Sequence, residues 1–292
     1  MTVSVGIGLA FVAMLCWGIG DFLIQKSTRK IGDFETLFLI TLFGALVLLP
    51  FVYKDVPLLF VSGNENILLV LGGGSLILFV AALLEFEALR EGKISVVEPM
   101  WSLEIVAAFL FAFAILGERL TPVAVILIVS LIAGLFLVSF RGRVFSHRHF
   151  FERGVYIGLL SAVLMGVANF FVGWGARLTD ALMVNFTLNV IITALSGAYL
   201  LFSGRLLKTF QDLVRFRAAL LPMMITDNAA WIAYAFAMTL IPIAIATALS
   251  ESYIIIAVIL GLAVSHERLQ LHQKVGLGAA GAAAVTLAAM TA

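Results

Sequence analysis

Long apolar runs constrain the folding of this chain more than any other feature of its sequence. A run of about 20 apolar residues matches an α-helix that crosses the hydrocarbon core of a bilayer. Ten such runs occupy about residues 4–25, 36–53, 66–89, 94–116, 121–140, 154–175, 181–203, 218–239, 242–264 and 273–291. We therefore predict an all-α integral membrane protein with ten transmembrane helices.

The composition excludes a soluble globular protein. Hydrophobic residues make up 63% of the 292 residues and charged residues 12%, whereas soluble domains have about 45–50% and about 25%. A soluble fold of this size needs a polar surface that this chain cannot supply. The connections between the runs are short, so they leave no room for a soluble domain. The single cysteine, Cys16, excludes a disulfide framework.

The basic residues are distributed unevenly between the two sides of the expected membrane. The connections after the first, third, fifth, seventh and ninth runs hold 15 Lys and Arg, and the opposite side holds 3. Because cytoplasmic loops are enriched in these residues, we expect a multi-pass cell-membrane protein with both termini on the non-cytoplasmic side. The first run lacks a basic leader and is too long for a cleavable signal peptide, so it reads as a span. Residues 204–217 mix apolar and basic positions and indicate a surface helix.

The chain contains an internal repeat. Gly117-Glu118-Arg119-Leu120 follows the fourth run, and His266-Glu267-Arg268-Leu269 follows the ninth run 149 residues later. Residues 17–22 align with residues 165–170 at an offset of 148. Each copy then holds five spans, and because five is odd, the second copy enters the membrane inverted. We predict two inverted five-helix repeats, residues 1–140 and 154–292, joined by a connection at 141–153, with a site between them near the midplane.

These features resemble the drug/metabolite transporter superfamily, and in particular its EamA-type ten-helix carriers. The resemblance covers essentially the whole chain. It rests on Trp17-Gly18, on the Gly-Glu-Arg-Leu ending of the fourth span with its echo after the ninth, and on the five-plus-five plan. It implies a carrier of metabolites, amino acids or drugs that is driven by protons or exchange. It also implies a cavity between spans 1, 3, 4, 6, 8 and 9, but it names no substrate.

Acidic residues lie inside several of the expected spans. An ionisable group in hydrocarbon costs at least about 2.5–3.5 kcal/mol on insertion scales, so each is a functional candidate. The seven acids are Asp21, Glu85, Glu87, Glu98, Glu104, Asp227 and Glu251. No Lys or Arg lies well inside a span, so the interior needs protons, metal cations or a cationic substrate to neutralise it.

The acids nearest the middle of a span carry the most functional weight. Glu104, Asp227 and Glu251 occupy such positions. Glu98 precedes Pro99, which removes a backbone donor and can open carbonyl groups toward a cavity. These four are therefore the strongest candidates for binding a substrate cation or a proton.

The acids near span ends have a second interpretation. Asp21 lies about one turn from Lys26, so a salt bridge at the membrane edge is the alternative to a binding role. Glu85 and Glu87 lie within two turns of the end of the third span, where they can act as gate charges or pair with Arg90. The sequence leaves both interpretations open.

Tryptophan side chains accompany these acids at helical spacing. Three of them share a helix face with an intramembrane acid: Trp17 with Asp21, Trp231 with Asp227, and Trp101 with Glu98 and Glu104. An aromatic face beside a carboxylate suits a cation, because cation–π attraction contributes about 0.5–2 kcal/mol. The alternative is that tryptophan fills space between helices.

Other polar side chains inside the spans are weaker markers: Asn169, Asn185, Asn189, Asn228 and Tyr253. Asparagine in a span often bonds a neighbouring helix, which contributes about 0.6 kcal/mol. Asn169 stands out because it occupies the position of Asp21 in the repeat, where an amide in place of a carboxylate makes the two halves unequal.

Several other functions lack the residues that they need. Gly18-Ile19-Gly20-Asp21 matches the Gly-x-Gly-Asp of intramembrane aspartyl proteases, but no earlier span supplies the second aspartate. The four histidines lie in connections and form no convincing metal-ligand set. Neither a nucleotide-binding loop nor a basic aromatic groove is present in the sequence. We therefore expect no enzyme activity, cofactor, metal ion or nucleic acid.

We predict a secondary active transporter that moves a small cationic metabolite or drug-like compound across the bilayer by alternating access, with proton coupling or exchange. The substrate- and proton-binding residues are expected to be Trp17, Asp21, Glu98, Trp101, Glu104, Asn169, Asp227, Trp231, Glu251 and Tyr253. A gate set comprises Glu85, Glu87 and Arg90. One chain holds both halves, so we expect a monomer, with a dimer as the alternative.

Three alternative functions stay open at this stage. An exporter of amino acids or other zwitterions needs an anion-binding element, such as the N-terminus of a broken helix or a reachable Arg90. A cation channel would be lined by the same acids. A non-transporting membrane subunit would show no phenotype when these acids are replaced.

Overall fold

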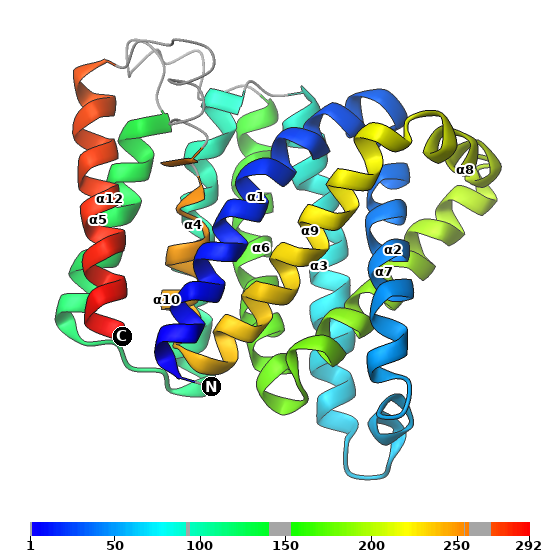
Figure 1. The fold of residues 1–292 in the computed structure, drawn as a ribbon, viewed down its shortest axis with the longest axis horizontal. Coiled ribbons are helices and arrows are strands. Elements are labelled where there is room, and N and C mark those ends of the chain that lie inside the picture. The colour runs from blue at the N-terminus through cyan, green and yellow to red at the C-terminus, as the bar shows by residue number, and fades with distance from the viewer. Residues whose placement is uncertain (1, 92–93, 140–152, 254, 257–269) are drawn as a thin grey trace.

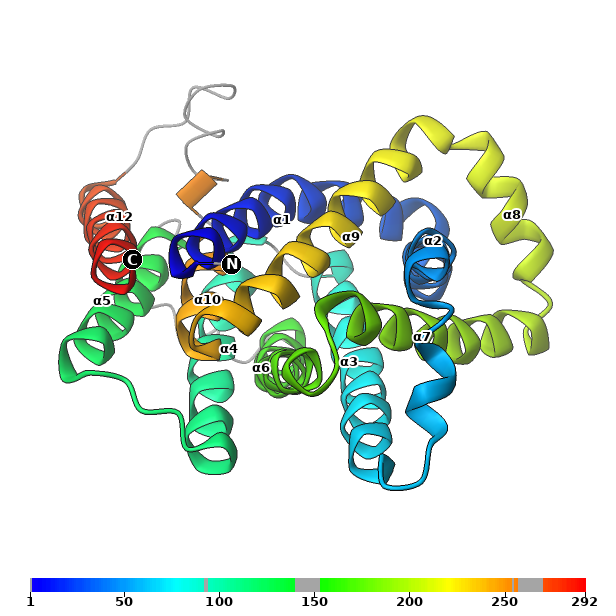
Figure 2. The ribbon, with the colours of Figure 1, turned by 60° about the horizontal axis from the view of Figure 1, so that its bottom comes forward.

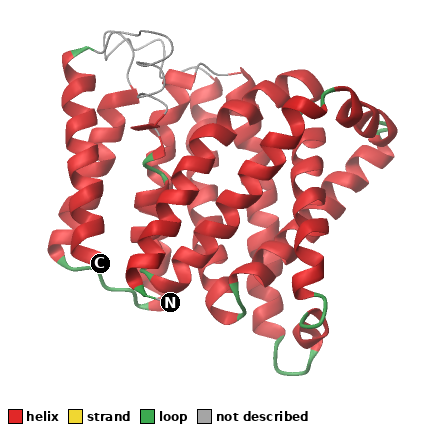
Figure 3. Ribbon diagram, viewed as in Figure 1, coloured by secondary structure: helices red, strands yellow, loops and turns green. Residues whose placement is uncertain are grey.

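The structure of the chain is a computed structural model that describes residues 2–91, 94–139, 153–253, 255–256 and 270–292, with the backbone alone for residues 89, 91, 94–100, 139 and 153–155. Within these ranges the regular elements are helices and no strand occurs (Figure 1, Figure 3). The helices are α1 (Val3–Ile31), α2 (Asp33–Val52), α3 (Glu65–Glu91), α4 (Ile94–Leu116), α5 (Pro122–Ser139), α6 (Arg153–Leu178), α7 (Ala181–Phe202), α8 (Leu206–Arg215), α9 (Arg217–Leu240), α10 (Ile243–Ser250) and α12 (Leu271–Thr291), with a short 3-10 helix η1 (Val56–Phe60).

Six of the described helices are long and apolar enough to cross a membrane. They are α1, α2, residues Glu65–Ala88 of α3, residues Tyr156–Leu178 of α6, α7 and α12. Two shorter apolar helical segments, Trp101–Leu116 and Pro122–Val138, accompany them. Large apolar side chains such as Phe22 and Phe51 are exposed on the outside of the bundle, where lipid would cover them. The chain is therefore an all-helical, multi-pass membrane protein, and its expected count of ten spans stays a prediction.

Two helix boundaries differ from those expected. α1 continues to Ile31 rather than ending near residue 25, because Gln, Lys and Arg end an apolar run but are good helix formers. Gly32, at φ 107°, then ends the helix.

The expected span at 242–264 is interrupted, since α10 ends at Ser250 and Glu251 lies at its C-cap. The Ser252 hydroxyl donates to Ala248 O at 2.8 Å, and such side-chain bonds compete with the helical pattern.

Helices that are far apart in the sequence pack side by side. α1 lies along α9, α3 and α4 lie along α6, α2 lies along α7, and α5 lies along α12 (Figure 1, Figure 2). Small residues allow the closest of these approaches. A Cβ atom on Gly134 of α5 would lie 2.7 Å from Ala280 N of α12, and one on Gly276 would lie 2.7 Å from Gly134 O. Close backbone packing of this kind drives helix association in lipid, where the hydrophobic effect between helices is absent.

Candidate substrate-binding site

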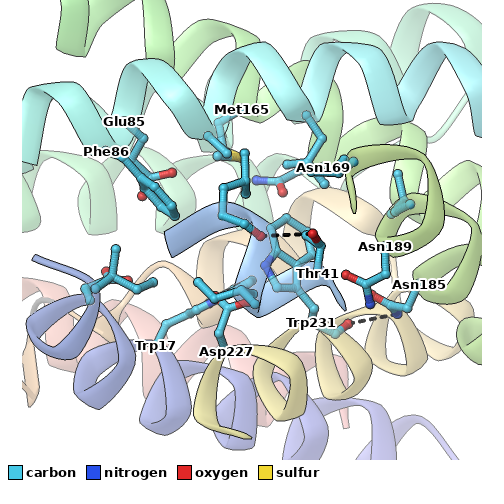
Figure 4. A pocket seen from close by; sticks show the side chains of 18 of the residues that line it. Trp17, Thr41, Glu85, Phe86, Met165, Asn169, Asn185, Asn189, Asp227 and Trp231 are labelled. Atoms are coloured by element: carbon cyan, nitrogen blue, oxygen red, sulfur yellow. Dashed lines mark hydrogen bonds between the residues drawn. The ribbon is translucent and has the colours of Figure 1, made fainter. Parts of the chain in front are cut away.

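A cavity lies inside the bundle, between α1, α2, α3, α4, α6, α7, α9 and the residues after α10 (Figure 4). Its empty volume is about 830 Å³, including the part that opens to solvent. The residues that line it come from helices in both halves of the chain.

The cavity wall is acidic. Five carboxylate side chains line it: Asp21, Glu85, Glu104, Asp227 and Glu251. No lysine or arginine belongs to the lining, as far as the described residues go. All five line the same cavity, so their negative charges would repel one another. A bound cation or proton would relieve this repulsion.

One wall of the cavity is built where α1 and α9 pack along each other. Trp17 and Asp21 are one turn apart on α1, and Asp227 and Trp231 are one turn apart on α9. The ring centroids of Trp17 and Trp231 are 5.3 Å apart at an interplanar angle of 83°. Tyr234 joins them with its ring centroid 5.0 Å from that of Trp17. Two carboxylates thus stand beside an aromatic cluster, as the sequence spacing predicted.

A second wall is built where α4 and α6 meet. The Asn169 amide donates from Nδ2 to Glu104 Oε2 at 3.2 Å, and both side chains are buried. This approach depends on Gly166, because a Cβ atom there would lie 2.5 Å from Glu104 O and 2.6 Å from Ala107 Cβ. The glycine therefore lets α4 carry Glu104 into the cavity.

A third wall presents amides and a hydroxyl. Asn185 and Asn189 of α7 and Thr41 of α2 line the cavity. Thr193 donates to the Thr41 hydroxyl at 2.9 Å, which ties α7 to α2. Sequence reasoning gave the asparagines little weight and missed Thr41. Hydropathy alone could not have found Thr41, because a threonine in a span usually bonds its own backbone.

The interruption after α10 supplies the remaining acid. Glu251 is buried at the C-cap of α10 and Tyr253 follows two residues later. Both line the cavity. The break in the helix therefore coincides with the site, as it does where broken helices bind substrates or ions in carriers.

Four sequence-predicted residues are not part of the described lining. Trp101 is 2% exposed, and its indole Nε1 has no hydrogen-bond partner in the described part of the chain. Glu87 is half-buried on α3 and is not among the lining residues. Arg90 pairs with Asp33 of α2, with 2.8 Å between Arg90 Nη1 and Asp33 Oδ2. The side chain of Glu98 lies outside the described residues.

A link between helix ends was not predicted. Glu118, just after α4, forms an ion pair with Arg177 of α6, with 2.5 Å between Oε1 and Nη1. Glu118 also accepts from the Ile243 amide at 3.1 Å, at the start of α10. Arg177 donates to Met238 O at 2.8 Å and to Ile241 O at 3.1 Å, at the end of α9. The two side chains therefore join the ends of four helices.

A double-mutant cycle measures this link. We expect Glu118→Gln and Arg177→Gln each to destabilise the protein by about 1.5–3 kcal/mol, because each removes a charged hydrogen-bond partner. The double variant should lose much less than the sum of the two single losses. The measurement is the unfolding of purified protein in detergent. Additive losses would show that the two side chains do not act together.

The fold and the cavity together define a class, a multi-pass helical membrane protein with an acidic cavity inside its bundle. The chain belongs to the EamA-like transporter family, whose sequence profile matches residues 4–140 and again residues 152–289. The family expected from the sequence is thereby confirmed.

Two known proteins are similar to it. An uncharacterized transporter of Archaeoglobus fulgidus is 23% identical over 156 residues, which are 53% of this chain and 52% of that protein. The match thus spans about half the length of that relative. A chain described as a crystal structure of a protein has 19% identity and a TM-score of 0.69, covering 97% of this chain and 95% of its own. That likeness shows the same fold.

Proposed function

We propose that this chain is a secondary carrier that moves a small cationic compound across the bilayer by alternating access, with a proton or a second cation in exchange. The observation that carries the proposal is the set of five carboxylates around one cavity without a basic residue in its described lining. A carboxylate surrounded by apolar protein is stabilised by a bound proton or by a bound cation. Competition between the two for the same groups would couple their movements.

Specific roles follow from this arrangement. Asp21, Glu104, Asp227 and Glu251 would bind the cationic group or the coupling proton, with Trp17, Trp231 and Tyr253 as the aromatic part of the site. Asn169 would orient Glu104, to which it donates. Glu98 and Trp101, and the gate set of Glu85, Glu87 and Arg90, remain proposals from the sequence. Of the gate set, Glu85 lines the cavity and is the best supported.

Two inverted repeats would provide the alternating access. The family profile matches the chain twice, at 4–140 and 152–289, which supports the division into residues 1–140 and 154–292. In the two repeats, α1 corresponds to α6 and α3 corresponds to α9. The packing of α1 along α9 therefore has its counterpart in the packing of α6 along α3. Under the offset of 148, Arg177 corresponds to Arg29 in the first half. Under the offset of 149, Glu118 corresponds to Glu267 in the second half, which lies outside the described residues. We also propose that the chain has ten membrane spans and functions as a monomer.

The alternatives receive less support. A zwitterion carrier needs a group for the substrate carboxylate, and the described lining contains no basic side chain. A channel needs a continuous path, whereas Glu118 and Arg177 tie four helix ends together.

Counterflow tests the proposed function. A panel of amines, amino acids and sugars is first screened for thermal stabilisation of the purified protein, which reaches about 2.7 kcal/mol at a hundredfold excess over Kd. Proteoliposomes loaded with the unlabelled best ligand should then accumulate the labelled ligand transiently and saturably. Accumulation without saturation would indicate a channel. Stabilisation by amino acids or sugars alone would contradict the cationic substrate.

A further inference from the structure

The orientation of the asparagine amides in the cavity wall is fixed by backbone carbonyl groups. Asn228 donates from Nδ2 to Ile40 O at 3.0 Å and to Met224 O at 2.9 Å. A carbonyl oxygen can only accept, so the Asn228 amide has one orientation, and its Oδ1 is left to accept. Asn189 donates to that oxygen from Nδ2 at 3.2 Å. The carbonyl oxygen of Asn189 is left without a donor among the described residues, beside one unused N–H.

The neighbouring amide is fixed in the same way. Asn185 donates from Nδ2 to Ala181 O at 2.8 Å and to Trp231 O at 3.3 Å. Its two N–H groups are thereby used, and its Oδ1 has no partner among the described residues. Asn185 and Asn189 are one turn apart on α7, and both line the cavity at the end away from Glu85 (Figure 4).

A third amide repeats the pattern deeper in the site. Asn169 is 1% exposed and uses Nδ2 to bond Glu104, while its Oδ1 is buried without a partner in the described chain. An unpaired buried carbonyl oxygen costs about 1–3 kcal/mol. The cavity thus offers carboxylate oxygens and, apart from them, amide oxygens that still lack donors.

We infer that the substrate of this cavity is a short aliphatic diamine or polyamine, with one amino group held by the carboxylates and a second held by the amide oxygens of Asn185 and Asn189. This inference rests on the proposed function and specifies its substrate class.

The separation of the two sets of acceptors agrees with a short chain between the amino groups. Asn185 bonds the backbone of Trp231, which is one helical turn from Asp227 on α9, or about 6 Å along the helix axis. Trp17 and Trp231 lie beside this stretch and present apolar surface. An alkyl chain would pack there while its two ends bond the two sets of oxygens.

Other cations fit this wall less well. A quaternary ammonium ion has no N–H group, so it would leave the amide oxygens unpaired. A monoamine would satisfy the carboxylates and leave the oxygens of Asn185 and Asn189 without donors. A second ammonium group also neutralises more of the charge of the five acids. The diamine is therefore the ligand that satisfies both parts of the wall.

The test compares three probes on the intact purified chain: putrescine as the diamine, n-butylamine as the monoamine and tetramethylammonium as the quaternary ion. Isothermal titration calorimetry gives each affinity. We expect putrescine to bind at least about tenfold more tightly than either of the others, because it adds charged hydrogen bonds at a second site. Equal affinities for the three cations would overturn the diamine inference and leave the cationic carrier standing. Failure of all amines to bind would overturn the proposed function as well.

Variants locate the second amino group. Asn189→Leu should weaken putrescine binding by about tenfold more than n-butylamine binding, because the acceptor that it removes belongs to the second site. The substitution also removes the donor to Asn228 Oδ1, and that loss affects both amines equally. The matched control is Thr187→Val, on the same helix and outside the cavity lining, where the hydroxyl bonds Met183 O of its own helix; this variant should change neither affinity. An equal loss for both amines in Asn189→Leu would contradict the assignment. The comparison of probes on the unaltered chain decides the question even where a variant does not fold.

Discussion

Glu104→Gln and Asp227→Asn should each lower transport by at least about tenfold while the protein still folds. Both side chains are buried, at 5% and 7% exposure, and both line the cavity. An amide keeps the size of the side chain and can still bond Asn169, so packing is retained. The charge that would hold a cation is lost, and charged hydrogen bonds contribute about 1.5–3 kcal/mol.

Transport in proteoliposomes is the measurement, with thermal unfolding as the check on folding. Asp55→Asn is the matched control, because Asp55 is an exposed carboxylate between α2 and η1. It should transport as well as the unaltered chain. Unchanged transport in both cavity variants would refute the assignment of the site.

Gly166→Ala should destabilise the protein by about 1–3 kcal/mol, the usual cost of overpacking. The added Cβ would lie 2.5 Å from Glu104 O and 2.9 Å from Glu104 Cα. These are backbone atoms of α4, so the helices must separate. Glu104 would then move with α4, and transport should fall together with the melting temperature.

The control for this prediction should change stability in the opposite direction. Gly278 of α12 has no atom within 4 Å of its Cβ position. Gly278→Ala should therefore be neutral or stabilising by up to about 1 kcal/mol, since alanine is the better helix former. Melting temperatures of the two variants in the same detergent provide the comparison. Equal losses at both positions would show that the α4–α6 contact is not tight.

The sequence was sufficient for the class of protein and for part of the cavity lining. Of the four acids weighted most, three line the cavity, and the side chain of the fourth, Glu98, lies outside the described residues. Apolar runs predict membrane helices because lipid requires them, and an acid inside such a run needs a reason to be there. Asp21, Glu104, Asp227 and Glu251 indeed line one cavity. Trp17 and Asp21 are four residues apart, as are Asp227 and Trp231. Helix geometry alone puts each pair on one face, so these pairs could be predicted from the sequence as well.

The rest depends on contacts between helices, which periodicity does not contain. Hydropathy did not separate Trp101, which is buried outside the lining, from Trp231, which lines the cavity. The end of α10 at Ser250 lies at a polar triplet, Ser250-Glu251-Ser252, but the apolar residues on both sides made the whole stretch look like one span. The partner of Arg90 is Asp33, on a different helix. The bonds that orient Asn185 likewise come from a neighbouring helix.

The link between Glu118 and Arg177 also bears on leakage through the proposed carrier. It joins the end of α4, in the first half of the chain, to helix ends in the second half. Charged hydrogen bonds contribute about 1.5–3 kcal/mol. In the empty carrier, the form with this link broken would therefore be about tenfold to a hundredfold less populated than the form with the link intact. An empty carrier would then seldom change its facing, and ion gradients across the membrane would be spared futile cycling. In the proposed carrier, tightness in the absence of substrate would then depend on two side chains outside the cavity lining.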